Sequence, residues 1–447
     1  MTTSGRRPRT TAALLLSLLG SVLLVAGVLP SRADAAPGLP GVFHVSPAGY
    51  DGADGSLARP WRTIARATAT APAGSTVLVA AGTYEPFTVT QPGQTVAAMP
   101  GPHVLVKGRT GVRDVILVAA PGATLLDLSV TGCVPNARPE GGFGDGGSSA
   151  VRIDDGASGV TVKGLTITDS RGTNEHGLPF GCYGILTHNA DAPRIIGNDI
   201  SGTGTGVYLN GGGRLAVVAD NRIHGNNVLI RNTPGGDDDY GANAITFANV
   251  SALPGAVATR NVITGNSGPS SDYRYDGGAF EIYNSSNVQI LANTISNNEN
   301  VLETGTSPDG NNPLGDCVGN SFVGNDVTGR TAGSGLERSI GMILRCATAM
   351  VIKGNTFTEI DWWVYEITTG DKFSSDVIGL AITGNKITQY QKVYHLAVDP
   401  LAALLAIDAN RIHFTGPVFA SHGDGTTSLT LADWQARTGQ DRVTADY

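Results

Sequence analysis

Short runs of alternating apolar and polar residues recur along most of the chain. They are rich in β-branched and aromatic side chains and are bounded by Gly and Asn, as is typical of half-buried β-strands. Four of them are Gly206-Val207-Tyr208-Leu209, Ala244-Ile245-Thr246-Phe247, Ala279-Phe280-Glu281-Ile282 and Val364-Tyr365-Glu366-Ile367. Alternation directs one set of side chains into a core and the other set toward solvent. Helical periodicity is found only around residues 64–71, so we predict an almost entirely β protein with one short helix near the N-terminus.

The strand-like runs are organised by a repeated phrase, in which a polar turn residue, usually Asn, is followed by a variable residue and an apolar one. The Asn residues of this phrase are Asn198, Asn221, Asn261, Asn293, Asn320, Asn355, Asn385 and Asn410, at intervals of 23, 40, 32, 27, 35, 30 and 25 residues. Such irregular spacing argues against helical repeats of fixed length and favours a solenoid whose coils carry insertions of different sizes. We expect the Asn side chains to stack as a ladder in the turns, where Asn tolerates left-handed backbone. The pattern therefore predicts a parallel β-helix.

Composition and charge narrow the class of partner. The 447 residues include 61 glycines, about twice the usual share, which favours a turn-rich β architecture. Acidic residues number 38 against 30 Lys and Arg, a formal net charge of -8. Because phosphate neutralisation needs clustered Lys and Arg, this balance argues against a nucleic-acid partner.

The N-terminus predicts the compartment. Arg6, Arg7 and Arg9 precede an apolar run between Leu14 and Val28, and Ala33-Asp34-Ala35 offers a small-x-small cleavage site. This order is typical of a secretory signal peptide, and the apolar run is short for a membrane span of about 20 residues. We therefore expect residues 1–35 to be removed. The mature protein is expected to be an extracellular monomer that is not attached to a membrane.

Four cysteines, Cys133, Cys182, Cys317 and Cys346, are compatible with two disulfides in an oxidising compartment. Three pairings are possible and the sequence does not choose among them. The local choice pairs Cys133 with Cys182 and Cys317 with Cys346. Four buried thiols are the alternative.

Three stretches resemble secreted right-handed parallel β-helix proteins of the pectin-lyase-like superfamily. Residues 44–52, with Pro60-Trp61-Arg62-Thr63-Ile64 and the stretch up to Tyr84, are similar to the N-terminal cap of that group. The Asn-x-Ile coils cover the middle, and residues 431–441 resemble the segment that follows the last coil. The resemblance implies a right-handed parallel β-helix with a short N-terminal capping helix. It places the cap and first coils at 36–100, further coils at 101–416 and a C-terminal segment at 417–447. It does not imply one activity, because the superfamily includes lyases, hydrolases, epimerases and adhesins.

The densest group of candidate catalytic residues lies between Asp272 and Glu303. The side chains of Glu281 and Tyr283 are expected to face outward, and Glu303 follows Glu281 by 22 residues, about one uninterrupted coil. Adjacent coils lie one strand spacing apart, ~4.8 Å, so we expect the two carboxyl groups to stand one above the other. Such proximity raises one pKa and makes an acid and a base from the same residue type, as glycosidases require. Asp276, before Gly277-Gly278, is expected to reach the same patch.

Five residues are predicted to position a sugar in the groove of the solenoid: Arg274, Tyr283, Arg345, Trp363 and Glu366. Of the adjacent tryptophans Trp362 and Trp363, we expect one in the core and the other stacked on a sugar ring. The structural alternative is that Glu281 forms an ion pair with Arg274 or Arg345.

These residues favour a glycoside hydrolase that acts on a polysaccharide without a metal or other cofactor. The first alternative is a Ca²⁺-dependent lyase of a uronic-acid polymer, for which Asp237-Asp238-Asp239 would offer oxygen ligands if it is not simply a solvated turn. The lysine motifs of β-helix lyases are not recognisable around any of the six lysines. The second alternative is a non-catalytic glycan- or wall-binding solenoid.

Overall fold

The computed structural model describes residues 39–135, 147–306, 317–331, 336, 338–368, 373–396, 406–422 and 427–441. The predicted signal peptide, residues 1–35, lies outside this part of the chain. Within the described ranges, no helix is both long and apolar enough to cross a membrane.

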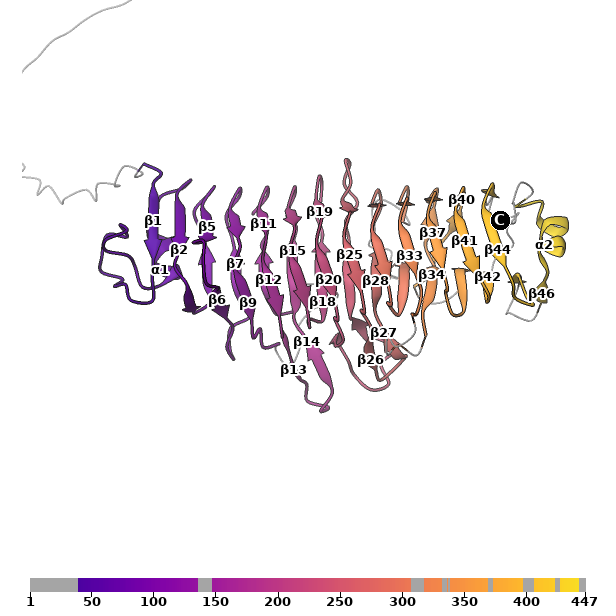
Figure 1. Ribbon diagram of the computed structural model, residues 1–447, viewed down its shortest axis with the longest axis horizontal. Helices are drawn as coiled ribbons and strands as arrows, with labels where there is room; N and C mark the ends of the chain where they lie inside the picture. Colours follow the sequence, from indigo (N-terminus) through magenta and orange to yellow (C-terminus); the bar gives the residue numbers. More distant parts are fainter. Residues whose placement is uncertain are drawn as a thin grey trace, which may run out of the picture. The chain divides into compact units, whose positions relative to one another are not determined.

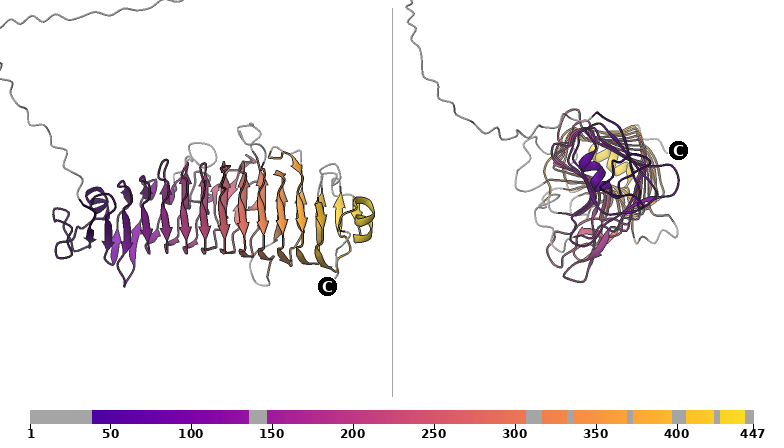
Figure 2. Two further views of the ribbon diagram at one scale, coloured as in Figure 1. Left: turned by 90° about the horizontal axis from the view of Figure 1, so that it is seen from above. Right: turned by 90° about the vertical axis from the view of Figure 1, so that its left-hand side faces the viewer.

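Three long sheets, in which all strand pairs but one are parallel, form the body of the protein (Figure 1). Each coil of the chain adds one strand to each sheet, so strands that are neighbours in a sheet come from successive coils. Figure 2 shows that the strands of successive coils follow one another along the stack. This is the predicted right-handed parallel β-helix.

The first sheet has 13 strands. In spatial order they are β1 (Val42–Val45), β2 (Thr76–Val79), β5 (Thr95–Ala98), β8 (Thr124–Leu126), β11 (Thr161–Lys163), β16 (Arg194–Ile196), β19 (Val217–Ala219), β24 (Val257–Thr259), β29 (Gln289–Leu291), β32 (Ser321–Val323), β36 (Val351–Lys353), β40 (Ala381–Thr383) and β43 (Ala406–Asp408).

The second sheet, which carries the candidate site, also has 13 strands. They are β4 (Phe87–Val89), β7 (Asp114–Val118), β10 (Ser149–Ile153), β15 (Tyr183–His188), β18 (Thr205–Asn210), β23 (Asn243–Ala248), β28 (Gly278–Tyr283), β31 (Asn300–Gly305), β34 (Ile340–Leu344), β38 (Trp363–Ile367), β42 (Lys392–Leu396), β45 (Ala420–His422) and β46 (Thr427–Leu429). Only the last pair, β45 and β46, is antiparallel.

The third sheet has 12 strands. They are β3 (Gly82–Tyr84), β6 (Val104–Lys107), β9 (Ser129–Thr131), β12 (Thr166–Thr168), β17 (Asp199–Ser201), β20 (Arg222–His224), β25 (Val262–Thr264), β30 (Thr294–Ser296), β33 (Asp326–Thr328), β37 (Thr356–Thr358), β41 (Lys386–Gln389) and β44 (Arg411–Phe414).

Insertions between coils form three small sheets. They consist of β13 (Arg171–Thr173), β14 (Pro179–Gly181), β21 (Leu229–Arg231) and β22 (Tyr240–Gly241), of the hairpin β26 (Gly268–Ser270) and β27 (Arg274–Asp276), and of β35 (Ala347–Thr348) with β39 (Val377–Ile378). The first two of these insertions lie beside the second sheet (Figure 1).

The Asn side chains form a continuous buried ladder, as predicted. Each side-chain Nδ2 donates to the Oδ1 of the next member at 2.8–3.1 Å, through Asn198, Asn221, Asn261, Asn293, Asn325, Asn355, Asn385 and Asn410. The apolar residue of each phrase then points into the core, as Ile295 and Phe357 do. The ladder therefore satisfies buried polar groups at the same place in each coil from Asn198 to Asn410.

Two details of the ladder prediction are wrong. Asn320 is not a member, because it lies before β32 of the first sheet and its amide donates to the Ser285 carbonyl. Asn325 takes that place. The left-handed residue is also not the Asn itself but the one before it: Asp220, Ala292 and Gly354, for example, have φ of 57°, 52° and 66°.

Helices close both ends of the described stack. The predicted helix is present as α1 (Ile64–Thr70), which is capped by the Thr63 side chain and buries Ile64 and Ala67. A second helix, α2 (Leu431–Thr438), carries a capping box made by Thr430 and Asp433. Its Trp434 is fully buried and stacks on Tyr394 at a centroid distance of 5.0 Å.

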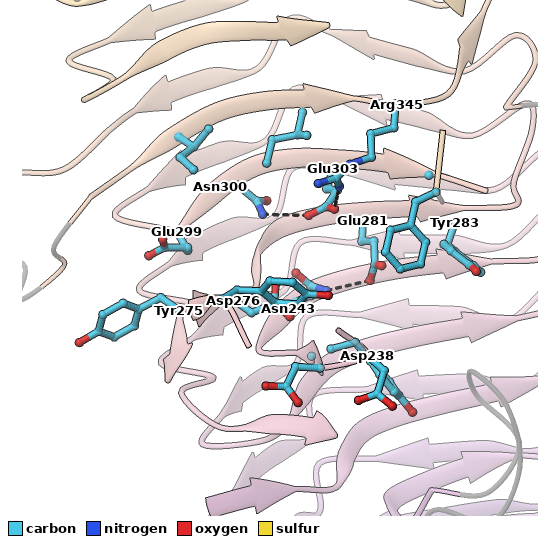
Figure 3. A pocket seen from close by; sticks show the side chains of 18 of the residues that line it. Asp238, Asn243, Tyr275, Asp276, Glu281, Tyr283, Glu299, Asn300, Glu303 and Arg345 are labelled. Atoms are coloured by element: carbon cyan, nitrogen blue, oxygen red, sulfur yellow. Dashed lines mark hydrogen bonds and ion pairs between the residues drawn. The ribbon is translucent and has the colours of Figure 1, made fainter. Parts of the chain in front are cut away.

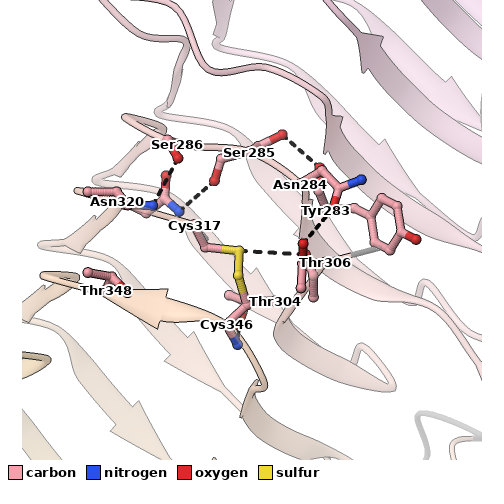
Figure 4. The surroundings of a disulfide bond; sticks show 12 residues. Tyr283, Asn284, Ser285, Ser286, Thr304, Thr306, Cys317, Asn320, Cys346 and Thr348 are labelled. Carbon is pink, nitrogen blue, oxygen red and sulfur yellow. Dashed lines mark hydrogen bonds between the residues drawn. A yellow bond between two sulfur atoms is a disulfide. The ribbon is translucent and has the colours of Figure 1, made fainter. Parts of the chain in front are cut away.

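Two disulfides join Cys133 to Cys182 and Cys317 to Cys346, which is the local pairing. Figure 4 shows the second of them. No cysteine is free. Two disulfides fit a protein that folds in an oxidising compartment.

Candidate active site

A cleft of about 530 Å³ opens over strands β23, β28, β31 and β34 of the second sheet (Figure 3). It is lined by Asp237, Asp238, Asp239, Tyr240, Gly241, Asn243, Tyr273, Tyr275, Asp276, Glu281, Tyr283, Glu299, Asn300, Glu303, Gly305, Arg338, Ile340, Ile343, Arg345 and Phe373. Carboxylates and aromatic rings dominate this lining, which is the composition expected of a site that binds a polar ligand with flat apolar faces.

The wall on the N-terminal side of the cleft rests on a small second hydrophobic core. Outward side chains of β15 and β18 are covered by the inserted strands β21 and β22, and the buried members of this core are Tyr183, Leu186, Tyr208, Ile230 and Ala248, with Tyr240 packed against them. The two phenol groups of Tyr183 and Tyr240 lie 3.4 Å apart. Apolar burial therefore fixes the insertion that carries Tyr240 and the aspartates before it.

Glu281 and Glu303 are register partners on the adjacent parallel strands β28 and β31. The predicted register is thus confirmed. Phe280 and Ile282, on either side of Glu281, are fully buried, while Glu281 itself is only partly buried and lines the cleft. Neighbouring strands lie about 4.8 Å apart, so the two carboxylates share one patch of the cleft floor.

Glu281 is held by two neutral donors. Its Oε2 accepts hydrogen bonds from Asn243 Nδ2 at 2.8 Å and from the Thr246 hydroxyl at 3.1 Å. Burial, followed by the negative charge of Glu303, raises the pKa of Glu281 to about 7. This carboxyl can therefore carry a proton at neutral pH.

Glu303 has a different environment. It forms an ion pair with Arg345, and Asn300 Nδ2 lies 3.5 Å from its Oε2 (Figure 3). The side chains of Glu303 and Arg345 are 28% and 23% exposed, so the pair is reachable from the cleft. Arg345, one of the two arginines that the structural alternative offered to Glu281, forms an ion pair with Glu303.

Asp276 ends the inserted strand β27 and lies in the same cleft. Its Oδ1 accepts the Gly277 N–H at 2.7 Å. Burial and the nearby charge of Glu303 raise the pKa of Asp276 well above its ordinary value. Gly277 adopts φ of 105°, a conformation that favours glycine, and this bend brings the hairpin strand back to β28.

Asp238, Asp239 and Asp272 place carboxylate oxygens within 4.8 Å of one another. All three already accept hydrogen bonds from the protein. Asp239 Oδ2 accepts from the hydroxyls of Ser270 and Ser271 at 2.7 and 3.0 Å, Asp272 accepts the N–H groups of Gly235 and Asp238, and Asp238 pairs with Arg231. The group ties the 231–241 insertion to the β26–β27 hairpin.

Of the five predicted sugar-binding residues, Tyr283 and Arg345 line the cleft and three do not. Arg274 belongs to the exposed part of the β26–β27 hairpin. Trp363 and Glu366 lie on β38, one strand beyond Ile340 and Ile343. Neither tryptophan is in the core: Trp362 is 42% exposed, and Trp363 is half-buried on the outer face, where it stacks on His395.

Several residues that line the cleft were not predicted from the sequence, although the positions of two of them follow a sequence pattern. Asn243 and Asn300 each begin a strand three residues before an outward residue, Thr246 or Glu303. The same offset separates Gly278 from Glu281. Glu299 and Arg338, which form an ion pair at the edge of the cleft, had no comparable sequence signal, because Arg338 lies in an insertion.

A family model described as "Protein of unknown function (DUF1565)" matches residues 47–335, more than half of the chain. The chain belongs to the DUF1565 family. This DUF1565 protein is also 28% identical, over 202 residues, to "Uncharacterized protein YwoF" of Bacillus subtilis (strain 168). The match covers 41% of the chain and spans 42% of the length of that relative.

Solved structures similar to this DUF1565 protein are also β-helices. The GH136 lacto-N-biosidase of Eubacterium ramulus matches with a TM-score of 0.50 and 11% identity, covering 86% of this chain and 68% of that one. XylC in complex with xylose matches with a TM-score of 0.49 and 10% identity, covering 85% and 76%. A rhamnogalacturonan lyase matches with a TM-score of 0.39 and 14% identity, covering 91% and 86%. At such identities the likeness concerns the fold, which is the right-handed parallel β-helix that the resemblance to the pectin-lyase-like superfamily implies.

Proposed function

We propose that this protein is a secreted glycoside hydrolase that cleaves a polysaccharide or long oligosaccharide in the cleft of the second sheet. The observation that carries the proposal is the register pairing of Glu281 with Glu303 in unlike environments. Two carboxyl groups of one residue type, of which one is neutral and the other ion-paired, are the elements of an acid and a nucleophile or base.

In the proposed reaction, Glu281 donates its proton to the glycosidic oxygen while the bond from that oxygen to the anomeric carbon breaks. The carboxylate of Glu303 attacks the anomeric carbon from the other side and forms a glycosyl ester. Glu281, now ionised, removes a proton from water, and the resulting attack releases Glu303 and the sugar. One strand spacing of about 4.8 Å is closer to the separation of about 5–5.5 Å in retaining enzymes than to the larger one in inverting enzymes, so we expect retention.

Three further lining residues support this reaction. The raised pKa of Asp276 favours its neutral form, so that Asp276 assists by keeping a second negative charge away from the nucleophile. Arg345 orients Glu303 through their ion pair, and Tyr283 offers a ring and a hydroxyl to the sugar. Arg274, Trp363 and Glu366 stay predictions for substrate contact outside the cleft.

The charge of the lining favours an uncharged glycan. Seven lining side chains are carboxylates and two are arginines, and both arginines, Arg338 and Arg345, are engaged with Glu299 and Glu303. A uronic-acid polymer would bring further negative charge to this surface without a free cation among the described lining residues, which disfavours the lyase. The similarity to a lacto-N-biosidase fits a carbohydrate substrate and supports no particular linkage.

The test is a screen of plant, algal and bacterial-wall glycans that reads new reducing ends and ultraviolet absorbance in parallel. New reducing ends without absorbance, undiminished by EDTA, support the proposal. Products with an absorbing double bond, lost with a chelator, indicate a Ca²⁺-dependent lyase instead. Retention of a glycan in a pull-down with no new ends indicates a non-catalytic binding protein. Proton NMR of the first product shows whether the anomeric configuration is kept.

Secretion belongs to the same proposal. The charged, apolar and small-residue order of residues 1–35 and the two disulfides support export. N-terminal sequencing of protein recovered from culture medium is expected to begin at Ala36. Recovery of the chain only from the cell interior, with its first residues intact, would contradict export.

A further inference from the structure

The floor of the cleft is made of two rows of side chains that continue onto the next strands toward the C-terminus. The first row runs through the register partners Glu281, Glu303, Ile343, Glu366 and His395, on five successive strands. Glu366 and His395 are half-buried, so this row stays accessible beyond the cleft.

The second row also continues beyond the cleft toward the C-terminus. It contains Asn300 and its register partner Ile340. On the next strand, Tyr365 is the register partner of Met342. Because Ile340 and Trp363 each lie two residues before these partners, Trp363 follows Ile340 in the row. Lys392 follows as the partner of Trp363.

In the opposite direction the floor is covered. The partner of Glu281 on β23 is Thr246, and the residues before it in the row are Tyr208 and Leu186. Tyr208 and Leu186 are 2% and 0% exposed because the inserted strands β21 and β22 pack over them. The described part of the chain therefore covers the floor from Tyr208, two coils before Glu281, and leaves it accessible at Glu366 and His395 on the C-terminal side.

The open side carries an aromatic surface that is continuous with the cleft. The rings of Trp362 and Trp363 have centroids 5.2 Å apart, and Trp363 stacks on His395 at 4.7 Å with an interplanar angle of 21°. The guanidinium of Arg338 lies 5.0 Å from the centre of the Trp362 ring. Arg338 also lines the cleft and pairs with Glu299, so it joins the cleft wall to the tryptophans.

The geometry points to a one-sided platform for further units of the glycan, running from Glu303 over Ile343 toward Trp363, Glu366 and His395. Three strand spacings, roughly 14 Å, separate Glu303 from His395 along the stack, which leaves room for more than one sugar ring. Indole faces stack on the apolar face of a sugar, while Glu366, Lys392 and His395 offer partners for its hydroxyls. Because the other side is closed, the glycan enters with one chain end against the wall and is cut near that end. The glycan nature of the ligand rests on the proposed function, whereas the direction and the one-sidedness are new.

The native chain permits a direct binding test by tryptophan fluorescence. It has four tryptophans, of which Trp61 and Trp434 are buried at the two ends of the stack, at 2% and 0% exposure. Quenching by acrylamide thus reports mainly on Trp362 and Trp363. The probes are xylo-, manno- and N-acetylchito-oligosaccharides of two and of six units, titrated into Glu303→Gln protein so that hydrolysis does not interfere.

We expect the six-unit sugar of at least one series to shield the tryptophans from acrylamide and to bind roughly tenfold or more tightly than its two-unit homologue. Trp362→Ala and Trp363→Ala should each remove that preference. Trp363→Phe, which keeps a ring, should retain most of it, and Tyr50→Ala, at an aromatic residue 71% exposed in the N-terminal cap, should leave it unchanged. Circular dichroism verifies the fold of each variant.

Equal binding of long and short sugars, no binding in any series, or a length preference that survives both tryptophan-to-alanine substitutions would overturn the platform. Products of the wild-type enzyme provide the second readout: short sugars released from the start of the reaction support cutting near a chain end, and early products of all lengths contradict it. Length-dependent binding without hydrolysis by the wild type would sink the proposed function and leave the platform standing. Hydrolysis without length-dependent binding would overturn the platform and leave the proposed function standing.

Discussion

Glu281 and Glu303 face each other across one strand spacing, yet their partners are of opposite kinds. Glu281 accepts hydrogen bonds from the neutral side chains of Asn243 and Thr246, whereas Glu303 is paired with the cation of Arg345. Two groups with the same chemistry are thereby placed in different electrostatic environments by residues contributed from different coils. This difference is the basis of the predictions on activity and pH.

Replacing either carboxylate should abolish most activity and leave the fold intact. Glu281→Gln and Glu303→Gln are each expected to lower kcat by about 10²–10⁴-fold, because proton transfer and covalent catalysis each depend on one of them. The double variant should be little worse than the more damaged single one, since the two groups act as a unit. Initial rates on the glycan found in the screen measure this.

The matched control is Glu85→Gln, a carboxylate 73% exposed on a distant coil. It should keep wild-type rates and the same thermal midpoint. Wild-type activity in the Glu281→Gln, Glu303→Gln double variant would reject the assignment.

The charge of Glu303 should be visible in the titration of Glu281. The pKa of Glu281 is raised to about 7 first by burial and then by Glu303, so Glu303→Gln should lower the pKa of Glu281 while leaving it above its ordinary value. Carbon-13 NMR of side-chain carboxyl groups measures the shift. An unchanged pKa would show that the two carboxylates are not electrostatically coupled.

The wild-type rate should fall as pH rises through about 7, because the proton that Glu281 donates is then lost. A pH profile of kcat/KM reveals this limb. A rate that stays level through that range would argue against Glu281 as the acid.

The raised pKa of Glu281 should also make the stability of the folded protein depend on pH. The pKa of Glu281 in the folded state, about 7, is higher than its ordinary 4.5, so the native state keeps a proton that the unfolded state releases between these values. Stability from this group is therefore complete at low pH and is lost as pH rises from 4.5 through 7. Glu281→Gln, which stays neutral, should show a smaller decline of the thermal midpoint over this range than wild type or Glu85→Gln. Parallel curves would contradict the burial of Glu281.

The Asn ladder ends at the carboxylate of Asp441, and we expect this carboxylate to contribute to the free energy of unfolding. Asp441 is fully buried and accepts hydrogen bonds from Asn410 Nδ2, Trp434 Nε1 and the Tyr394 hydroxyl at 3.0, 3.2 and 3.1 Å. Because all three partners donate, Asp441→Asn would set an amide N–H₂ against donors and should cost about 1–3 kcal/mol of unfolding free energy. The exposed Asp326→Asn is the control, and chemical denaturation is the measurement. Equal midpoints for the two variants would contradict this account of the ladder end.

The two disulfides should contribute similarly to stability and differently to activity. Their loops span 49 and 29 residues, and in the chain-entropy account each closure is worth about 4 kcal/mol. Cys346 directly follows Arg345, so the Cys317→Ser, Cys346→Ser variant should also lose activity at a temperature where it is still folded. Cys133→Ser, Cys182→Ser should not. Equal rates of the two variants, measured while both are folded, would show that the Cys317–Cys346 disulfide does not help to position Arg345.

Most of the fold could be predicted from local patterns. Alternation within Phe280-Glu281-Ile282 sets which side chains are buried, and the Asn-x-Ile phrase marks one turn of each coil. The register of Glu281 with Glu303 could be predicted from their spacing, because the chain between them makes one coil without an insertion. The ladder prediction went wrong at Asn320 because two turns of the same coil contain the same phrase, and only hydrogen bonding to the coils before and after tells Asn320 from Asn325.

By itself, the sequence determined the solenoid, the outward position of the carboxylates and their spacing, because these depend on side-chain period and coil length. Tertiary structure alone decided that Arg345 pairs with Glu303, that Asn243 supports Glu281, and that the floor is covered at Tyr208 and accessible at Trp363. The physical reason is that these contacts join different coils and insertions. The reach of an insertion across the sheet depends on the packing of its own small core, which no local pattern records.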